Sequence, residues 1–433
     1  MQEKETDLRL HIRETPLCDS HEHMIKEDAY LERNPDILQN LFENYVSGDL
    51  HSAGVSEEVL KRLVDPTNPD TASRFRGVEE AWKAIQHTGY AEAIRLTAKH
   101  LYRVDEITAD TLEAAQEHNE KLVQPGQRIH ILRDLANLDH IQTDDGTWPC
   151  RPDQSGADFF FYDITWASFC SGRPDLEGLI KETDIDVTSL ASLREAMHLL
   201  FQKYGSTAIA VKSQHAYNRT LSWKKRTDVE AEKALQAWRT DPENMDEETR
   251  LCLGDWCWAR GCELCSEHNL PFKIHTGYYA GNDRMPVDYI RAGNMCPLLA
   301  EFPETRFVLM HIAYPYSNEL VALTKHYRNV YADLCWAWSI DPFSSCDFVR
   351  RYLHAAPANK LFVFGGDTTL PAISLGYAWQ ARNWLTRALQ GEVTDGLLTE
   401  PQAIILATRL MKDNQYECFQ VLSKRKTTTT AVA

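Results

Sequence analysis

Two histidines separated by one residue, His21 and His23, follow an apolar stretch that begins at Leu17. This stretch predicts a β-strand, and because side chains alternate along a strand, both imidazoles point to the same side. Two neighbouring imidazoles can hold zinc or a similar divalent metal. The pair alone is weak evidence, since chance gives roughly half of one such pair in a chain with 16 histidines in 433 residues. Its meaning depends on the residues that follow.

Four further residues able to do chemistry stand at the ends of predicted strands. They are Lys212, His275, His311 and Asp367. Taken singly, each has an ordinary structural explanation: a buried histidine, a strand-end charge that reaches water, or a helix cap. Their common position at strand ends favours a functional role for the group over any of these.

The chain alternates between strand and helix. Eight strands are predicted, at 17–23, 139–143, 157–164, 207–211, 272–275, 306–311, 330–334 and 361–364, and most are followed by helix. This alternation predicts parallel strands in a distorted (β/α)8 TIM barrel, whose active site lies at the carboxyl ends of the strands. An open doubly wound sheet would require a glycine-rich phosphate loop after the first strand, where His21-Glu22-His23 stands instead.

Residues 24–126 are rich in predicted helix and are not bounded by any linker-like segment. We therefore expect one barrel domain over 1–433, with 24–126 as a helical insertion after the first strand. The basic, threonine-rich segment 424–433 is expected to be flexible.

The formal net charge of −17 argues against nucleic acid and anionic membranes as partners. No apolar run is long enough to span a membrane, and residues 1–15 do not resemble a signal peptide. The eleven cysteines lack the spacing of a disulfide scaffold, so we expect a cytoplasmic protein with free thiols. The expected partner is a small-molecule substrate. The aromatic-rich helices after the last strand could also pack against a second copy of the chain.

The order His-x-His, Lys, His, His, Asp on strands 1, 4, 5, 6 and 8 resembles the amidohydrolase superfamily, over residues 17 to 370. The stretch 210–219, Ala-Val-Lys-Ser-Gln-His-Ala-Tyr-Asn-Arg, resembles the lysine-bearing segment of amidohydrolase-like domains fused to glutamine-synthetase-type domains. The helical insertion after strand 1 is similar to that of uronate isomerases, which belong to the same superfamily.

The resemblance implies a role for each strand-end residue. His21, His23, His275 and Asp367 would be metal ligands, and Asp367 would also accept a proton from bound water. His311 would bind a second metal or polarise the substrate carbonyl. Lys212 would bridge two metals if carboxylated, or bind the substrate's carboxylate if unmodified. The polar residues after Lys212 favour the unmodified form, and with it one ion, expected to be zinc, over two.

Elementary chemistry supports these roles. A divalent ion lowers the pKa of a bound water to about 7, and a carboxylate beside it can take the proton. The only cation among the strand-end residues, a lysine, suits an anionic substrate. We therefore expect a metal-dependent hydrolase that attacks an amide, ester or lactone of a small, carboxylate-bearing substrate. Candidate catalytic residues are Asp367, His311 and Lys212, and candidate substrate contacts are Lys212, His215, Arg219, Tyr278, Arg284 and Trp336.

Two alternatives remain open. A non-hydrolytic member of the same superfamily, a uronate isomerase or a decarboxylase, would use the same ligands. A barrel that serves only as a binding or structural partner is a different class, because fold does not fix function.

Overall fold

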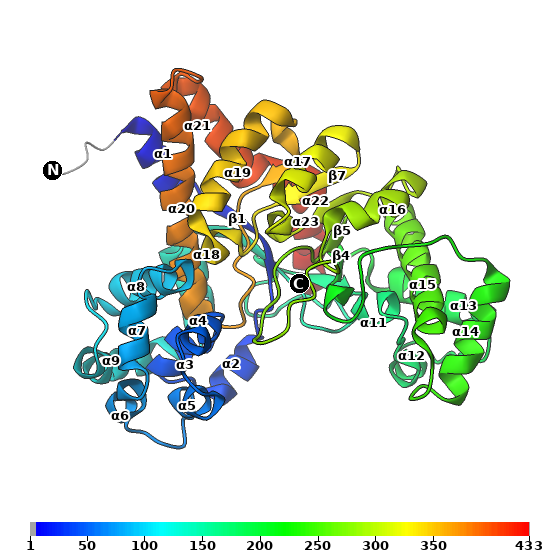
Figure 1. Cartoon of the computed structure of the whole chain (residues 1–433), viewed down its shortest axis with the longest axis horizontal. Helices are drawn as coiled ribbons and strands as arrows, with labels where there is room; N and C mark the ends of the chain where they lie inside the picture. The colour runs from blue at the N-terminus through cyan, green and yellow to red at the C-terminus, as the bar shows by residue number, and fades with distance from the viewer. Residues whose placement is uncertain (1–5, 433) are drawn as a thin grey trace.

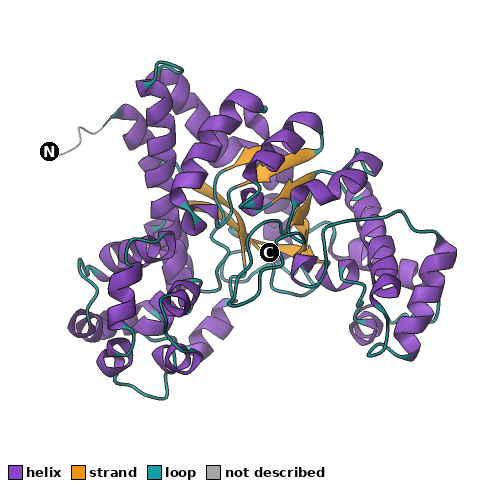
Figure 2. Cartoon of the chain, viewed as in Figure 1, coloured by secondary structure: helices purple, strands orange, loops and turns teal. Residues whose placement is uncertain are grey.

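The computed structural model describes residues 6–432 (Figures 1 and 2). Eight parallel strands lie side by side in chain order, and helices surround them, as Figure 2 shows in orange and purple. The strands are β1 (Leu17–Glu22), β2 (Leu138–Thr143), β3 (Phe160–Thr165), β4 (Ala210–Ser213), β5 (Phe272–Ile274), β6 (Phe307–Leu309), β7 (Val330–Asp333) and β8 (Leu361–Phe362). The predicted (β/α)8 barrel is confirmed.

The barrel closes between β1 and the chain that leaves β8. The Ser20 amide donates to the Phe364 carbonyl at 2.9 Å, and the Asp367 amide donates to the His21 carbonyl at 3.0 Å. These bonds continue the ladder beyond the two residues of β8, which is shorter than the sequence predicts. The closure also brings Asp367 beside the end of β1.

Helices fill most of the crossovers on the outside of the barrel. They are α11 (Ala167–Cys170), α12 (Leu176–Thr183), α13 (Leu190–Tyr204), α14 (Asp228–Thr240), α15 (Glu247–Glu267), α16 (Cys296–Glu301), α17 (Ser317–His326), α18 (Ala337–Ile340), α19 (Pro342–Ala355) and α20 (Pro371–Thr394). Residues 228–267 form two helices, α14 and α15, because Asp246 caps the start of α15 by accepting from the Thr249 amide.

Eight helices form the insertion between β1 and α10 (Gln127–Ile129), drawn from blue to cyan in Figure 1. They are α2 (Glu27–Arg33), α3 (Ile37–Phe42), α4 (Val46–Ser52), α5 (Glu57–Leu63), α6 (Thr71–Arg76), α7 (Glu79–Ile85), α8 (Gly89–Tyr102) and α9 (Ala109–Leu122). The insertion packs on the barrel through α8 and α20, where Gln380 donates to the Gly89 carbonyl and to Glu92, both at 2.8 Å.

The last residues are helical, whereas the sequence predicts a flexible tail over 424–433. After α21 (Glu400–Thr408), η6 (Arg409–Asp413) and α22 (Asn414–Phe419), the helix α23 covers Val421–Val432. The buried Lys424 amine donates to the Gly205 carbonyl at 2.9 Å, and the Thr428 hydroxyl donates to the Ala157 carbonyl at 2.7 Å. These long-range bonds explain why the described part of the tail is fixed.

Across residues 6–432, no helix combines the length and apolar character that crossing a bilayer requires.

The contact between α8 and α20 predicts a specific sensitivity. A Cβ added at Gly376 would lie 2.1 Å from Thr97 Oγ1 and 2.3 Å from the Ala93 carbonyl oxygen. We expect Gly376→Ala to lower the free energy of unfolding by about 1–3 kcal/mol, because the packed helices must separate. Gly391→Ala on the same helix is the control, since the nearest atoms to its Cβ belong to the Arg350 side chain, at 3.2 Å, and not to a backbone. Chemical denaturation measures both, and equal stabilities would contradict the prediction.

Candidate metal centre

Three side chains meet at the end of β1. His21 Nε2 lies 3.3 Å from both His23 Nε2 and Asp367 Oδ1, and His23 Nε2 lies 3.4 Å from Asp367 Oδ1. Donors placed about 2.0–2.1 Å from one tetrahedral ion lie roughly 3.3–3.4 Å apart. The three donors therefore already stand at the separations that one ion requires. Together they form a candidate metal-binding group, which we call the triad.

A backbone carbonyl orients the lone pair of His23 toward the triad, and burial keeps His21 uncharged. His23 Nδ1 lies 2.7 Å from the Asp144 carbonyl oxygen, which can only accept, so Nδ1 carries the proton and Nε2 is free. Burial, and then the charge of Lys212, hold the pKa of His21 well below its usual value. At neutral pH His21 is therefore an uncharged ligand.

His275 and His311 form a second pair close to the triad. The Tyr278 carbonyl fixes the proton of His275 on Nε2 at 2.9 Å, and the Cys335 carbonyl fixes that of His311 on Nδ1 at 2.8 Å. The remaining nitrogens, His275 Nδ1 and His311 Nε2, face each other at 2.9 Å. Two lone pairs at this distance repel unless a proton or a metal lies between them. The structure thus pairs His275 with His311 instead of adding it to the triad.

Asp367 stands between the two histidine pairs. Its Oδ1 faces the triad histidines, and its Oδ2 lies 3.8 Å from His311 Nε2. Burial raises the pKa of Asp367, but the hydrogen bond with His21 and the surrounding histidines outweigh burial and leave the pKa well below its usual value. The carboxylate is therefore ionised at neutral pH.

The backbone around Asp367 is held in an unfavourable conformation from two sides. Its φ of +55° lies in the left-handed region, which costs a non-glycine residue free energy. The Tyr45 hydroxyl, from the insertion, donates to the Asp367 carbonyl at 2.5 Å. Glu22 accepts from the Thr368 amide at 2.5 Å and from the Ser374 hydroxyl at 2.8 Å. The insertion and β1 together therefore fix the position of the carboxylate.

Lys212 reaches the centre from β4. Its Nζ lies 2.9 Å from His21 Nε2, and the side chain is fully buried. Beneath it, Lys273 on β5 donates to Asp163 Oδ2 and to the Ser20 carbonyl, at 2.9 and 2.8 Å. Asp163 Oδ2 in turn lies 3.7 Å from His21 Nδ1, a buried atom without a hydrogen-bond partner among residues 6–432.

The buried charges around the centre do not balance. Carboxyl groups outnumber the two lysines, and burial raises the pKa of Asp19 to about 8, of Asp333 to about 7 and of Asp163 to about 6. An uncompensated negative charge is costly in a buried site, and a bound cation would offset it. The carboxyl groups are Asp19, Glu22, Asp163, Asp333 and Asp367, and the lysines are Lys212 and Lys273.

The candidate substrate contacts separate into two groups. Trp336 and Tyr278 lie at the centre: the Trp336 ring is perpendicular to His311 at 5.3 Å, and Tyr278 lies 6.0 Å from Trp336. Arg219 is buried and held by Asp255 at 2.7 Å and by backbone carbonyls, so its guanidinium has a structural role. The same holds for His215, which bonds Ser213 at 2.7 Å and lies against Trp258.

Arg284 lies in an exposed loop and donates to the Tyr217 carbonyl at 3.0 Å. The structure places the Arg284 side chain against Tyr217 and not at the triad. Sequence reasoning also missed several residues that shape the centre, because no local motif marks them in a strand, in the loop after β7 or in the insertion. They are Glu22, Tyr45, Asp163, Lys273 and Cys335.

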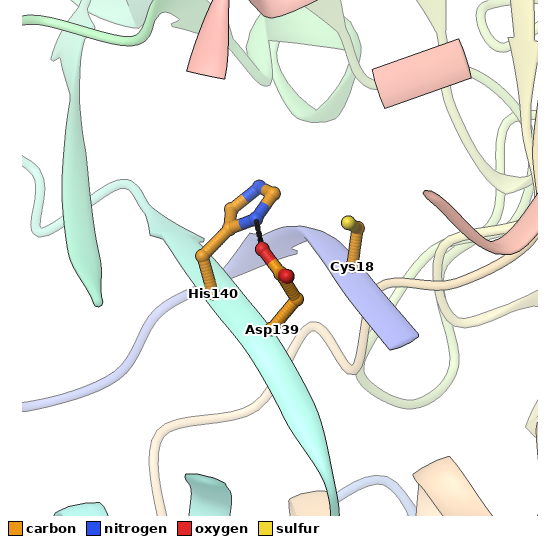
Figure 3. A group of neighbouring side chains, drawn as sticks. All are labelled: Cys18, Asp139 and His140. Atoms are coloured by element: carbon orange, nitrogen blue, oxygen red, sulfur yellow. Dashed lines mark hydrogen bonds and ion pairs between the residues drawn. The ribbon is translucent and has the colours of Figure 1, made fainter. Parts of the chain in front are cut away.

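A second cluster with metal-ligand residue types lies at the opposite ends of the strands (Figure 3). Cys18 begins β1, and Asp139 and His140 begin β2, with Asp139 3.0 Å from His140 Nδ1. Asp139 is already paired with Arg425 at 2.8 Å and Lys412 at 3.2 Å. These cations oppose a metal, so the cluster ties α23 and η6 to the barrel instead.

Comparison with known proteins agrees with the geometry. The family model described as amidohydrolase matches residues 235–397. Protein fluG of Emericella nidulans is 25% identical over 263 residues, which cover 56% of this chain and 30% of that protein. The match thus spans less than a third of the length of this relative. Residues 235–397, somewhat more than a third of the chain, are therefore similar to the amidohydrolase family.

Several solved structures share the fold of this chain. A uronate isomerase from Thermotoga maritima has a TM-score of 0.79 at 15% identity, covering 95% of this chain and 96% of that one. A glucuronate isomerase from Caulobacter crescentus has a TM-score of 0.77 at 17% identity, covering 95% and 93%. A Lactobacillus casei protein, proposed to be a metal-dependent hydrolase, has a TM-score of 0.64 at 16% identity, covering 96% and 98%.

The hold of Tyr45 on Asp367 predicts a change in metal affinity. We expect Tyr45→Phe to weaken zinc binding about 10- to 100-fold, as loss of a supporting hydrogen bond around a ligand typically does. Tyr377→Phe is the matched control, because the Tyr377 hydroxyl is buried without a partner among residues 6–432. Competition titration against a chelator gives both dissociation constants. An unchanged affinity in Tyr45→Phe would show that the insertion does not position the carboxylate.

Proposed function

We propose that this chain is a metal-dependent hydrolase of the amidohydrolase superfamily that attacks an amide, ester or lactone carbonyl of a small molecule. The triad geometry carries the proposal, since His21, His23 and Asp367 stand at the separations of one tetrahedral ion. Two imidazoles and a carboxylate suit zinc, which we propose as the metal. When bound, a divalent ion supplies an activated water and polarises a carbonyl.

The chain's own residues supply the remaining chemistry. Asp367 is buried and ionised, so its carboxylate can accept a proton from the attacking water and deliver it to the leaving group. His311 is neutral at pH 7, because burial lowers its pKa to about 4. Its Nε2, on the Asp367 side of the ring, can orient a substrate oxygen. Trp336 and Tyr45 cover this corner and exclude water.

We propose one ion, with Lys212 unmodified. The amine of Lys212 then offers a positive charge to a carboxylate of the substrate that reaches the centre. A specific observation supports two ions instead, namely the facing lone pairs of His275 and His311. Two ions would require a carboxylated Lys212 as a shared ligand. Carboxylation would replace the positive charge of the amine beside His21 with a group that donates oxygen atoms to a metal.

Isomerisation is the second candidate reaction. It is supported by the fold match to uronate and glucuronate isomerases, which covers 95% of this chain and so includes the helical insertion. The same residues would then hold an α-hydroxy-carbonyl group at the centre, and Asp367 would move a proton between the two adjacent carbons of that group.

All eleven cysteines carry free thiols, ten of them buried, which supports our proposal of a cytoplasmic location.

Metal content tests the site itself. We expect purified protein to bind one equivalent of zinc, and His23→Gln to lose it, because the triad would keep only two donors. His140→Gln is the control, since it alters the other cluster, where Arg425 and Lys412 oppose a cation. Elemental analysis and intact mass measure both forms. Two ions together with an added carboxyl group on Lys212 would overturn the one-ion proposal. Loss of zinc only in His140→Gln would show that zinc binds at the second cluster and not at the triad.

Product analysis separates the two reactions. With an active amide, ester or lactone found by screening, we expect isotopically labelled water oxygen in the product. We expect Asp367→Asn to slow turnover about 100- to 10,000-fold, the range of a lost proton acceptor. Asp134→Asn is the control, because Asp134 is exposed and pairs only with His130 and Arg133. A product of unchanged mass from a uronate, with no label incorporated, would establish isomerisation instead.

A further inference from the structure

A cavity of about 700 Å³ lies between the insertion and the loop that follows β5. We call it the aromatic chamber and define it by the rings of Tyr45, Tyr90, Tyr278 and Trp336, all of which line it. Tyr45 and Tyr90 come from the insertion, Tyr278 from the loop after β5, and Trp336 from the start of α18. Segments far apart in the sequence thus build one wall.

The chamber adjoins the candidate metal centre through two of its rings, Trp336 and Tyr45. The Trp336 ring is perpendicular to the His311 ring at 5.3 Å on one side and lies 4.3 Å from the Tyr45 ring on the other. The Tyr45 hydroxyl bonds the Asp367 carbonyl. Trp336 and Tyr45 thus contact both the chamber and residues of the centre.

Trp336 is held in a costly conformation at this junction. Its φ of +61° lies in the left-handed region, which a bulky residue rarely adopts, and its amide donates to the Gly365 carbonyl at 2.8 Å. The side chain is 2% exposed, yet its Nε1 has no hydrogen-bond partner among residues 6–432. A buried indole N–H normally has an acceptor. A ligand that fills the chamber can provide one after a small side-chain adjustment.

The rings offer flat faces to a ligand. Tyr90 and Trp336 lie 22° from parallel, and Tyr45 is tilted by 34° from Tyr90 and by 37° from Trp336. Aromatic groups pack on such faces in offset or edge-to-face arrangements. Apolar residues of the insertion continue the surface, among them Phe42, Leu60 and Leu63.

The charge of the chamber is unfavourable for an anion. The carboxylates Asp49, Glu57 and Asp283 line it, with Lys61 as the one lysine, and no arginine among residues 6–432 does so. A fourth carboxylate, Glu43, is paired with Arg33. Burial raises the pKa of Asp49, which shows that this carboxylate lacks a compensating cation. A carboxylate or phosphate in the chamber would meet repulsion, whereas an uncharged or cationic group would not.

We propose that the aromatic chamber binds an aromatic, uncharged or cationic group of the substrate, whose reacting carbonyl lies at the triad. This rests on the proposed function for the identity of the reacting end. Any carboxylate that the substrate carries then faces Lys212 within the barrel and not the chamber. The same composition distinguishes the substrate from a sugar acid, which has polar hydroxyl groups throughout and no aromatic ring.

The test uses zinc-loaded protein and three probes: phenylacetamide, phenylacetate and glucuronate. Isothermal titration or ligand-observed magnetic resonance gives each dissociation constant. We expect phenylacetamide to bind at least tenfold more tightly than glucuronate, and phenylacetate to lie between them. Tyr90→Leu should weaken phenylacetamide binding about 3- to 10-fold, the value of one aromatic contact. Tyr327→Leu, at the C-terminal end of α17 and outside the chamber lining, should leave it unchanged.

Zinc content of each variant is measured in the same samples, so that loss of the fold is distinguished from loss of the contact. Tighter binding of glucuronate than of phenylacetamide, or equal phenylacetamide affinity in Tyr90→Leu and the parent chain, would overturn the chamber proposal. Phenylacetamide binding that depends on Tyr90 in a protein unable to hold zinc would support the chamber and overturn the proposed hydrolase. Failure of the two proposals is therefore distinguishable.

Discussion

The closure of the barrel between β1 and the chain that leaves β8 is the constraint on which the centre depends. The two segments share backbone hydrogen bonds at Ser20 and at Asp367. Because of them, the carboxylate of Asp367 comes within 3.4 Å of His21 and His23, which lie about 345 residues away along the chain. The left-handed backbone of Asp367 is the cost of this approach, and Tyr45 and Glu22 offset it.

Charge explains why the interior of the barrel is so polar at this end. Buried carboxyl groups are expensive unless they are paired, protonated or bound to a metal. Lys273 pairs with Asp163, and the raised pKa values of Asp19 and Asp333 show that protonation is within reach for these two groups. Asp367 differs from them, because its neighbours keep it ionised. The ionised carboxylate of Asp367 therefore lies beside the histidine side chains of the candidate metal centre.

The barrel and the insertion contribute different residues to the site. The strand ends supply the groups that hold a cation, and the insertion supplies Tyr45, which fixes Asp367, together with most of the wall of the aromatic chamber. The fold is shared with isomerases, but fold leaves the reaction open. The composition of the chamber, acidic and aromatic and without a lining arginine in the described chain, is a property of this sequence alone.

The sequence by itself determined the barrel and the residues at its strand ends. Strand periodicity and the alternation with helix are local signals, and the structure has His21, His23, Lys212, His311 and Asp367 in the last part of a strand or in the segment that follows it. Only the tertiary structure decided which of these side chains meet. His275 faces His311 rather than the triad, because two backbone carbonyls fix the ring protons.

The same limit explains the substrate contacts and the tail. Arg219 looks like a ligand for an anion in the sequence, but Asp255, 36 residues later, neutralises it. Residues 424–432 look like a flexible tail, but carbonyls of residues more than 200 positions earlier bind Lys424 and Thr428. Such pairings join residues that are distant along the chain, and local patterns carry no information about them. Residue type and spacing therefore determined which residues were candidates for the site. Tertiary packing decided which of them face the centre and which bind structural partners instead.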